Sequence, residues 1–359
     1  MKIQSPSLNV VLDKGSQGVW NSVPYLTALI WLNDGYLAYY QHLSLILILS
    51  SIGFGGAERS LISAQINLTH FLRQTLGLRI LGIAIYILVS TVYLETNLSY
   101  LVAGAAIISF NRTPLIEYAY LGKHVTRSLW PQKFMIMPLG ILARFWWRTP
   151  EAYLIIFSIE TLLLATAFTL GSRPLKIVNE IPLRWADYRY TLAELILVFI
   201  ATKLYLMVLP EDFEVGNLKL LHVFDYLPFL VGLSNNLMHV NRIALHAKTI
   251  AWVSVAAFVT IFIVQKVGSL DLVSTAYLAT KVFATLSTFI AFTFYKKLDF
   301  KVVFNAGLIA FVGVIVYFPT QYLLHDLSIF WFMLGSQALC FAYFLYEILK
   351  SENAPSHDR

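Results

Sequence analysis

Charged residues are scarce in this chain of 359 residues, at 13% of the sequence, and cysteine is almost absent. Soluble globular domains carry about 25% charged residues, so the composition excludes an ordinary soluble domain. The single cysteine, Cys340, lies in an apolar run, which excludes disulfides within the chain and zinc sites built from cysteines. No Gly-x-x-x-x-Gly-Lys-Ser/Thr loop occurs, so nothing indicates a nucleotide as energy source. Met1–Gln17 is mixed and polar, unlike a cleavable signal.

Apolar residues are abundant instead, at 58% of the chain. They gather in runs long enough to cross, as helices, the ~30 Å hydrocarbon layer of a membrane. Because that layer offers no water to the backbone, a spanning segment has to satisfy its own polar groups, as a helix does. The sequence therefore predicts an all-α, polytopic membrane protein with about twelve transmembrane helices. We place the spans at Val19–Trp31, Tyr36–Phe54, Leu76–Leu94, Leu98–Asn111, Phe134–Trp147, Ala152–Leu170, Tyr190–Leu209, Leu218–Val240, Ile250–Val267, Leu272–Tyr295, Val302–Leu323 and Ser328–Leu349.

The positive charges support this arrangement of spans. Cytoplasmic loops of membrane proteins concentrate Lys and Arg, so a correct set of spans leaves few cations outside. With the N-terminus inside, the only outer loop cations are Arg144, Arg148, Lys219 and Lys266. We therefore predict that both termini are cytoplasmic. Loop placement also accounts for the net charge of +6, so we expect no nucleic-acid partner.

The polar stretch Gly171–Arg189 divides the chain into two halves. It contains four cations and two prolines, Pro174 and Pro182, which disfavour a continuous helix. Six spans on each side mean that both halves enter the membrane in the same direction, as in repeats related by an axis along the membrane normal. The sequence predicts two six-helix bundles, residues 1–175 and 176–359, the second with a short cytoplasmic tail.

Several motifs along the chain resemble one transporter family. Asp34-Gly35-Tyr36 at the start of a predicted helix and Ser51–Glu58 at its end resemble the opening helices of Wzx-type O-antigen flippases. Arg112–Lys123 is similar to that family's Arg-Pro-Phe…Glu-Tyr-Tyr-Phe-Gln segment, and Thr202–Leu209 resembles its seventh-helix region. The motifs are short, but they occur in the family's order.

The resemblance implies both a fold and an activity. The fold would be that of the multidrug/oligosaccharidyl-lipid/polysaccharide (MOP) exporters, two six-helix bundles around a central cavity. The activity would be to move an oligosaccharide linked to undecaprenyl diphosphate across the bacterial inner membrane, beside membrane lipids and other polysaccharide-assembly proteins. No bond is made in such transport, so we expect neither an enzyme nor a cofactor.

Ionisable residues inside predicted spans are candidates for the transport site. A charge at mid-membrane costs roughly 2.5–3.5 kcal/mol on insertion scales, so it usually faces a cavity or a partner. Lys281 lies deep in its span and Lys203 nearer an end, and either cation would attract a diphosphate. Pairing with a neighbouring carboxylate, or extension of the Lys203 side chain to the interface, is the structural alternative.

Two carboxylates are candidates for ion coupling. Glu160, near the centre of its span, would carry a proton or pair with Lys281, or stay buried and neutral. Asp225 shares a helical face with His222, as a proton relay or as one hydrogen-bonded pair. No third ligand accompanies them, so a metal site is not expected.

The cytoplasmic entrance and the outer surface each hold one further group. Arg112, Glu117 and Lys123 lie at the entrance, where they would receive the carrier phosphate or anchor lipid headgroups. Arg144-Phe-Trp-Trp-Arg148 is typical of an aromatic belt at the outer interface.

Three other functions compete with a flippase. A MOP-type exporter of small cations would favour carboxylates over lysines in its cavity. A membrane enzyme, such as an O-antigen polymerase or ligase, would have a long outer loop rich in Arg and His, whereas the outer loops here are short. An inactive family member is the third alternative, since Tyr205 stands where the family often has Asp.

Overall fold

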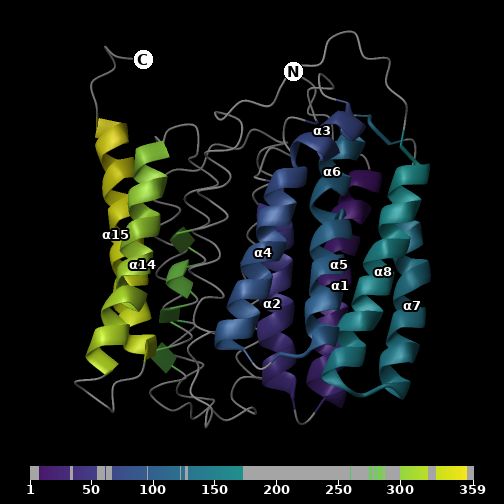
Figure 1. The fold of residues 1–359 in the computed structure, drawn as a ribbon. Helices are drawn as coiled ribbons and strands as arrows, with labels where there is room; N and C mark the ends of the chain where they lie inside the picture. The colour runs from purple at the N-terminus through teal and green to yellow at the C-terminus, as the bar shows by residue number, and fades with distance from the viewer. Residues whose placement is uncertain are drawn as a thin grey trace. The chain divides into compact units, whose positions relative to one another are not determined.

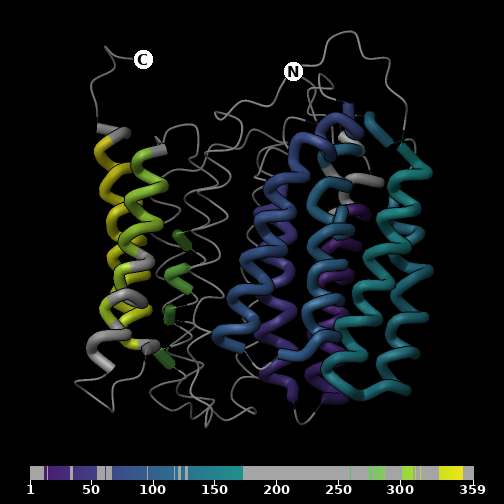
Figure 2. Tube along the Cα trace, in the orientation of Figure 1, coloured from purple at the N-terminus to yellow at the C-terminus, as the bar shows by residue number. Residues whose placement is uncertain are grey.

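The structure, a computed structural model, is helical in both parts of the chain (Figures 1 and 2). It describes residues 8–32, 35–54, 61, 67–94, 96–121, 123–125, 128–172, 259, 275–276, 279–280, 282–284, 286–287, 300–321 and 329–353. The chain divides into two compact units, Ser5–Leu195 and Ile196–Arg359 with Met1–Gln4. The predicted boundary near residue 175 lies outside the described residues and stays a prediction.

In the N-terminal unit the described residues form six long helices and two short ones. The long helices are α1 (Leu8–Trp31), α2 (Tyr36–Ile52), α4 (Leu76–Tyr93), α5 (Leu98–Phe110), α7 (Trp130–Trp146) and α8 (Pro150–Leu170). The short ones are α3 (Leu68–Gln74) and α6 (Thr113–Leu121). The six long helices coincide with the six predicted spans of this half, which confirms these segments as helices.

The largest difference from the predicted bounds is at α1, which begins at Leu8 instead of Val19. Its polar first turns extend the helix because they pack against the start of α7. Ser16 Oγ lies 3.3 Å from Lys133 Nζ, and the carboxylate of Asp13 accepts hydrogen bonds from two backbone N–H groups there. A tertiary contact therefore makes these residues helical.

Three helices in the described part of the chain are long and apolar enough to cross a membrane. They are α4, α8 and residues Trp331–Lys350 of α15 (Ile329–Asn353). The described residues are thus helical, with helices of the length and composition of membrane spans, and without a β-strand apart from one bridge between Val125 and Ser172. The finer count of about twelve spans stays a prediction, since the predicted spans between residues 190 and 258 lie outside that part.

The helices of the N-terminal unit lie side by side, with α5 packed against α2, α4 and α8, and α7 against α1 and α8 (Figure 1). Aromatic side chains fill the interior, and Gly104 on α5 makes room for one of them, because a Cβ there would lie 2.2 Å from the Tyr86 ring. Large apolar side chains remain exposed on α4 and α7, as expected of surface that faces lipid. They include Ile80, Leu81, Leu88, Met135, Leu139 and Leu142.

The two ends of this unit differ. At one end α1, α4 and α7 end and α2, α5 and α8 begin, and at the other end lie α3 and α6 (Figure 2). At the first end Gly35 has φ 76°, and a Cβ on it would lie 2.6 Å from Pro150, which follows the N-cap Thr149 of α8. Only glycine combines that backbone conformation with that contact. The positive charges predict that the α3/α6 end is cytoplasmic.

In the described part of the C-terminal unit, the long helices are α14 (Phe300–Gln321) and α15. They pack along each other, and Asn305 Nδ2 donates to the Tyr343 hydroxyl at 3.3 Å across the pair. Cys340 is buried on α15. Both helices confirm predicted helical segments, Val302–Leu323 and Ser328–Leu349, within a few residues.

Candidate functional site

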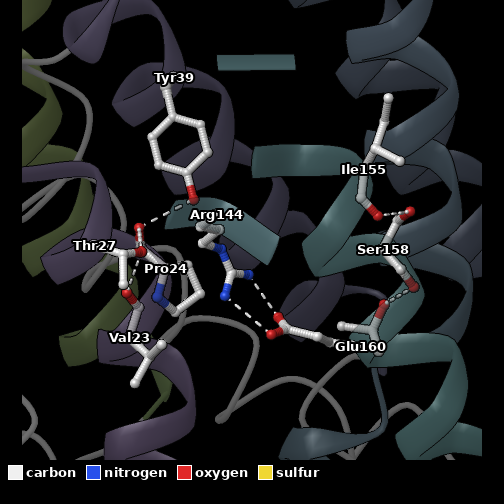
Figure 3. Close-up of polar contacts among 9 residues, drawn as sticks. Val23, Pro24, Thr27, Tyr39, Arg144, Ile155, Ser158 and Glu160 are labelled. Carbon is white, nitrogen blue, oxygen red and sulfur yellow. Dashed lines mark hydrogen bonds and ion pairs between the residues drawn. The ribbon is translucent and has the colours of Figure 1, made fainter. Parts of the chain in front are cut away.

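A charged pair lies inside the N-terminal unit, between α7 and α8. Arg144 donates two hydrogen bonds to Glu160, from Nη1 to Oε1 at 2.9 Å and from Nη2 to Oε2 at 2.6 Å (Figure 3). Arg144 is fully buried and Glu160 is 5% exposed. A buried charge without a partner is strongly destabilising, so the bidentate hydrogen bonding is what allows either group to stay ionised there.

Gly140 makes room for this pair. It lies one helical turn before Arg144, and a Cβ on it would lie 1.6 Å from Oε1 of Glu160. No side chain can occupy that position while the carboxylate stays where it is. The glycine is therefore part of the site, because it lets the backbone of α7 approach the carboxylate.

Tyrosines connect the pair to α1. The Tyr39 hydroxyl donates to the carbonyl of Pro24 at 3.2 Å, and the Tyr153 hydroxyl donates to the carbonyl of Thr27 at 3.5 Å. The two rings meet edge to face at 5.5 Å, and the Arg144 guanidinium lies 6.0 Å from the centre of the Tyr153 ring. Pro24 sits inside α1, where it removes one helical hydrogen bond. One connected polar cluster thus joins α1, α2, α7 and α8.

The structure corrects one sequence interpretation. Arg144 was expected in an outer aromatic belt, yet it points into the protein, while Trp146 and Trp147 are exposed. The sequence contained a signal for this, because Lys133, Met137, Gly140 and Arg144 follow each other at helical spacings and therefore share one face of the helix. The structure buries all four. Glu160 is buried on α8, where its partner is Arg144, and its role in ion coupling stays a prediction. Lys203, Lys281 and Asp225 lie outside the described residues.

A second cationic group lies at the α3/α6 end of the same unit. Arg79, in the first turn of α4, is 6% exposed and donates to the carbonyls of Leu72 and Ser109. Arg112, just after α5, donates to the same Ser109 carbonyl at 2.7 Å. Their guanidinium carbons lie 5.5 Å and 6.0 Å from the centre of the Phe54 ring. Burial, and to a smaller extent the charge of Arg79, lowers the pKa of Arg112 to about 10.

Of the other two predicted entrance residues, the structure describes the side chain of one. Lys123 is exposed beyond the end of α6, with a left-handed backbone at φ 60°. Glu117 lies within α6, but its side chain is outside the described atoms. The sequence identified Arg112 and missed Arg79, which lies at the edge of a predicted span, where a cation is ordinarily read as a headgroup anchor.

A third polar cluster joins α2, α4 and α5. The Tyr86 hydroxyl donates to the carbonyl of Tyr100 at 3.0 Å, so its oxygen accepts from Nδ1 of His42, also at 3.0 Å. The His42 ring stacks on Tyr100 with the ring centres 4.3 Å apart. These bonds satisfy polar groups that lie deep in the unit, and we assign the cluster to helix packing.

The described charged side chains are arranged in pairs. In the ranges that the structure describes, no three His, Cys, Asp or Glu side chains group in a way that would hold a metal ion. In the described part of the chain, the charged groups include the buried Arg144–Glu160 pair and the two neighbouring cations Arg79 and Arg112 at one end of the unit. No protein-family model, no curated protein and no solved structure matches this chain.

Proposed function

We propose that this protein is a flippase that moves an oligosaccharide linked to undecaprenyl diphosphate from the inner to the outer leaflet of a bacterial inner membrane. The observation that carries the proposal is the placement of charged side chains inside a unit built from apolar helices. Intramembrane charges cost free energy and usually mark a pathway for a polar substrate or an ion. The resemblance of Asp34–Tyr36, Arg112–Lys123 and Thr202–Leu209 to Wzx-type flippases adds the substrate class.

The proposed mechanism is alternating access between two six-helix bundles. The bundles would rock about the Gly171–Arg189 joint, so that a central cavity opens first inward and then outward. Lys203 and Lys281 would hold the diphosphate as point charges while the polyprenyl tail stays in lipid. Asp225 would serve ion coupling, and both termini would be cytoplasmic.

In this mechanism the Arg144–Glu160 pair, which has no net charge, holds helices of the N-terminal bundle together. Its two hydrogen bonds, 2.9 Å and 2.6 Å, tie α7 to α8, and the tyrosines tie the same place to α1 and α2. A bundle that moves as one body needs such internal ties, because each helix has to transmit the motion of its neighbours.

Genetic complementation tests the function. The flippase gene of a native surface-polysaccharide cluster is deleted, and surface glycan is measured with this chain supplied as wild type, Lys281→Ala or Arg148→Ala. Arg148 is an exposed cation beside the buried Arg144 and serves as the control. Rescue by wild type and Arg148→Ala, with loss in Lys281→Ala at equal protein level, is the expected result.

Other outcomes would favour the competing functions. If lipid-linked glycan reaches the outer leaflet without the protein but stays unpolymerised, a membrane enzyme of polysaccharide assembly is favoured. If the protein leaves glycan unchanged and instead confers resistance to small cations, a MOP-type exporter is favoured.

A further inference from the structure

Arg79 and Arg112 bring two positive charges together at one end of the N-terminal unit. Both donate to the carbonyl oxygen of Ser109, Arg79 Nη1 at 3.3 Å and Arg112 Nη1 at 2.7 Å. Both also lie within 6.0 Å of the centre of the Phe54 ring, which is fully buried. Two guanidinium groups that share one acceptor repel each other, and partial burial weakens the screening of that repulsion.

The protein groups around this pair position the charges without neutralising them. The recorded acceptors are backbone carbonyls near the ends of α3 and α5, and no carboxylate in the described part of the chain contacts either guanidinium. Gly53 permits the approach of Arg79, since a Cβ there would lie 2.8 Å from its Cγ. Arg79 Nε is buried without a hydrogen-bond partner.

Donor capacity remains for a ligand. A guanidinium carries five N–H donors in a planar fork that matches two oxygens of a phosphate. Arg112 is only partly buried, and the structure records one hydrogen bond from it. Its remaining donors lie beside the second cation, which is the arrangement that recognises an anion carrying more than one negative charge.

The surroundings favour an anion with an apolar tail. Large apolar side chains are exposed on the same ends of α4 and α5, namely Leu76, Ile80 and Phe110. A diphosphate at the two arginines would thus have lipid-facing surface within reach for a hydrocarbon chain. A free inorganic anion gains nothing from that surface.

We propose that Arg79 and Arg112 form a binding site for a lipid-borne diphosphate at the α3/α6 end of the N-terminal unit. The identity of that lipid as the polyprenyl carrier rests on the proposed flippase function, whereas the anion site itself does not. Arg112 would bind the headgroup through its remaining guanidinium N–H groups, and Arg79 would add positive charge from its buried position. Arg112 would thereby be the first contact of the substrate on the predicted cytoplasmic side.

The alternative is that the two arginines only cap helix ends. Cations near the last turn of a helix stabilise its carbonyls, and Ser109 and Leu72 lie in such turns. Capping predicts that substitution lowers stability equally with and without an anion. If the arginines form a binding site, an added diphosphate stabilises the wild type, and the substitution removes that stabilisation.

Binding of farnesyl diphosphate to the full chain in nanodiscs of zwitterionic lipid tests the site. The variants are Arg112→Gln, Arg112→Lys and the control Arg73→Gln, which removes an exposed cation of α3 at the same end. We expect the Kd to rise by roughly tenfold or more in Arg112→Gln, less in Arg112→Lys, and to stay within about twofold of wild type in Arg73→Gln. Equal effects of Arg112→Gln and Arg73→Gln, or no binding to wild type, would overturn the site.

Two competitors identify the source of the anion. Inorganic diphosphate that binds as tightly as farnesyl diphosphate, or anionic phospholipid in the nanodisc that abolishes binding, would overturn the choice of a lipid-borne diphosphate. Failure of the site and failure of the flippase function are distinguishable. Binding without complementation retains the site, and full rescue of surface glycan by Arg112→Gln retains the function and overturns the role of the site in it.

Discussion

Gly140 on α7 faces Glu160 on α8 so closely that a Cβ on the glycine would lie 1.6 Å from the carboxylate oxygen Oε1. That oxygen is the acceptor for Arg144 Nη1, which comes from the next turn of α7. The close approach of α7 to α8 and the pairing of Arg144 with Glu160 therefore depend on each other. Anything that separates the helices at Gly140 also separates the ions.

Gly140→Ala should destabilise the N-terminal unit. Overpacking costs about 1–3 kcal/mol, and displacement of Glu160 adds the cost of a weakened buried pair. Thermal unfolding of the purified protein in detergent, followed by tryptophan fluorescence, measures the loss. Gly77→Ala is the control, since nothing lies within 4 Å of a Cβ there. Equal melting temperatures for the two variants would contradict the close approach.

Removal of one partner of the Arg144–Glu160 pair should be worse than removal of both. Glu160→Gln leaves a buried guanidinium without its counter-charge, at a cost of about 3–5 kcal/mol. The double variant Arg144→Met with Glu160→Met removes both charges and should recover most of that loss. Thermal unfolding of wild type, of the single variants Arg144→Met and Glu160→Met and of the double variant gives the coupling between the two sites. Additive losses in the double variant would refute a direct pair.

Asp13 should stabilise the start of α7 although it lies 116 residues away from the first residue it contacts there. Its Oδ1 accepts the backbone N–H groups of Leu129 at 3.1 Å and Trp130 at 2.8 Å. Loss of such a cap costs about 1 kcal/mol, so Asp13→Ala should lower the melting temperature. Asp13→Asn keeps an acceptor oxygen and should lower it less. The same shift in both variants would assign the effect to something other than the cap.

The protein should lose stability at mildly acidic pH through His124. Nε2 of this buried histidine donates to the carbonyl of Leu61, and Nδ1 is buried without a partner. Burial lowers the pKa of His124 below its usual 6.5, against a smaller raising effect of the Leu61 carbonyl. Once the pH falls to the usual histidine pKa of 6.5, the unfolded chain binds more protons than the folded chain, so stability falls as the pH decreases further.

His124→Gln isolates this contribution, because its amide can donate to the same carbonyl and does not titrate. The melting temperature of wild type should fall more than that of His124→Gln between about pH 7.5 and about pH 5.5. Parallel curves would show that other groups control the pH dependence.

The positions of the long helices in the N-terminal unit could be predicted from the sequence within a few residues, except for the start of α1 at Leu8. The apolar runs at Tyr36–Phe54, Leu76–Leu94 and Ala152–Leu170 become α2, α4 and α8. Their length and composition suffice, because a run of apolar residues in a membrane has few alternatives to a helix. The short helices α3 and α6 escaped prediction because their seven and nine residues carry little periodic signal.

The partners of the charged residues depended on the packing of helices. Glu160 was recognisable as an unusual carboxylate, but its pairing with Arg144 depends on the rotation of α7 about its own axis. Within the motif Arg144–Arg148 the sequence gives every residue the same interfacial character, whereas the structure turns Arg144 inward and leaves Trp146 outside. That rotation is set by what packs best between neighbouring helices, which one segment does not encode.

The sequence by itself determined that the chain forms helices long and apolar enough to cross a membrane, and where the long N-terminal helices lie. Hydrophobicity and length are local properties, and the membrane turns them directly into structure. Only the tertiary structure decided that Gly140 admits Glu160 to Arg144, and that Arg79 joins Arg112 beside Phe54. Those contacts join segments that are separate in the sequence, and their geometry depends on how closely the helices approach and how each is rotated.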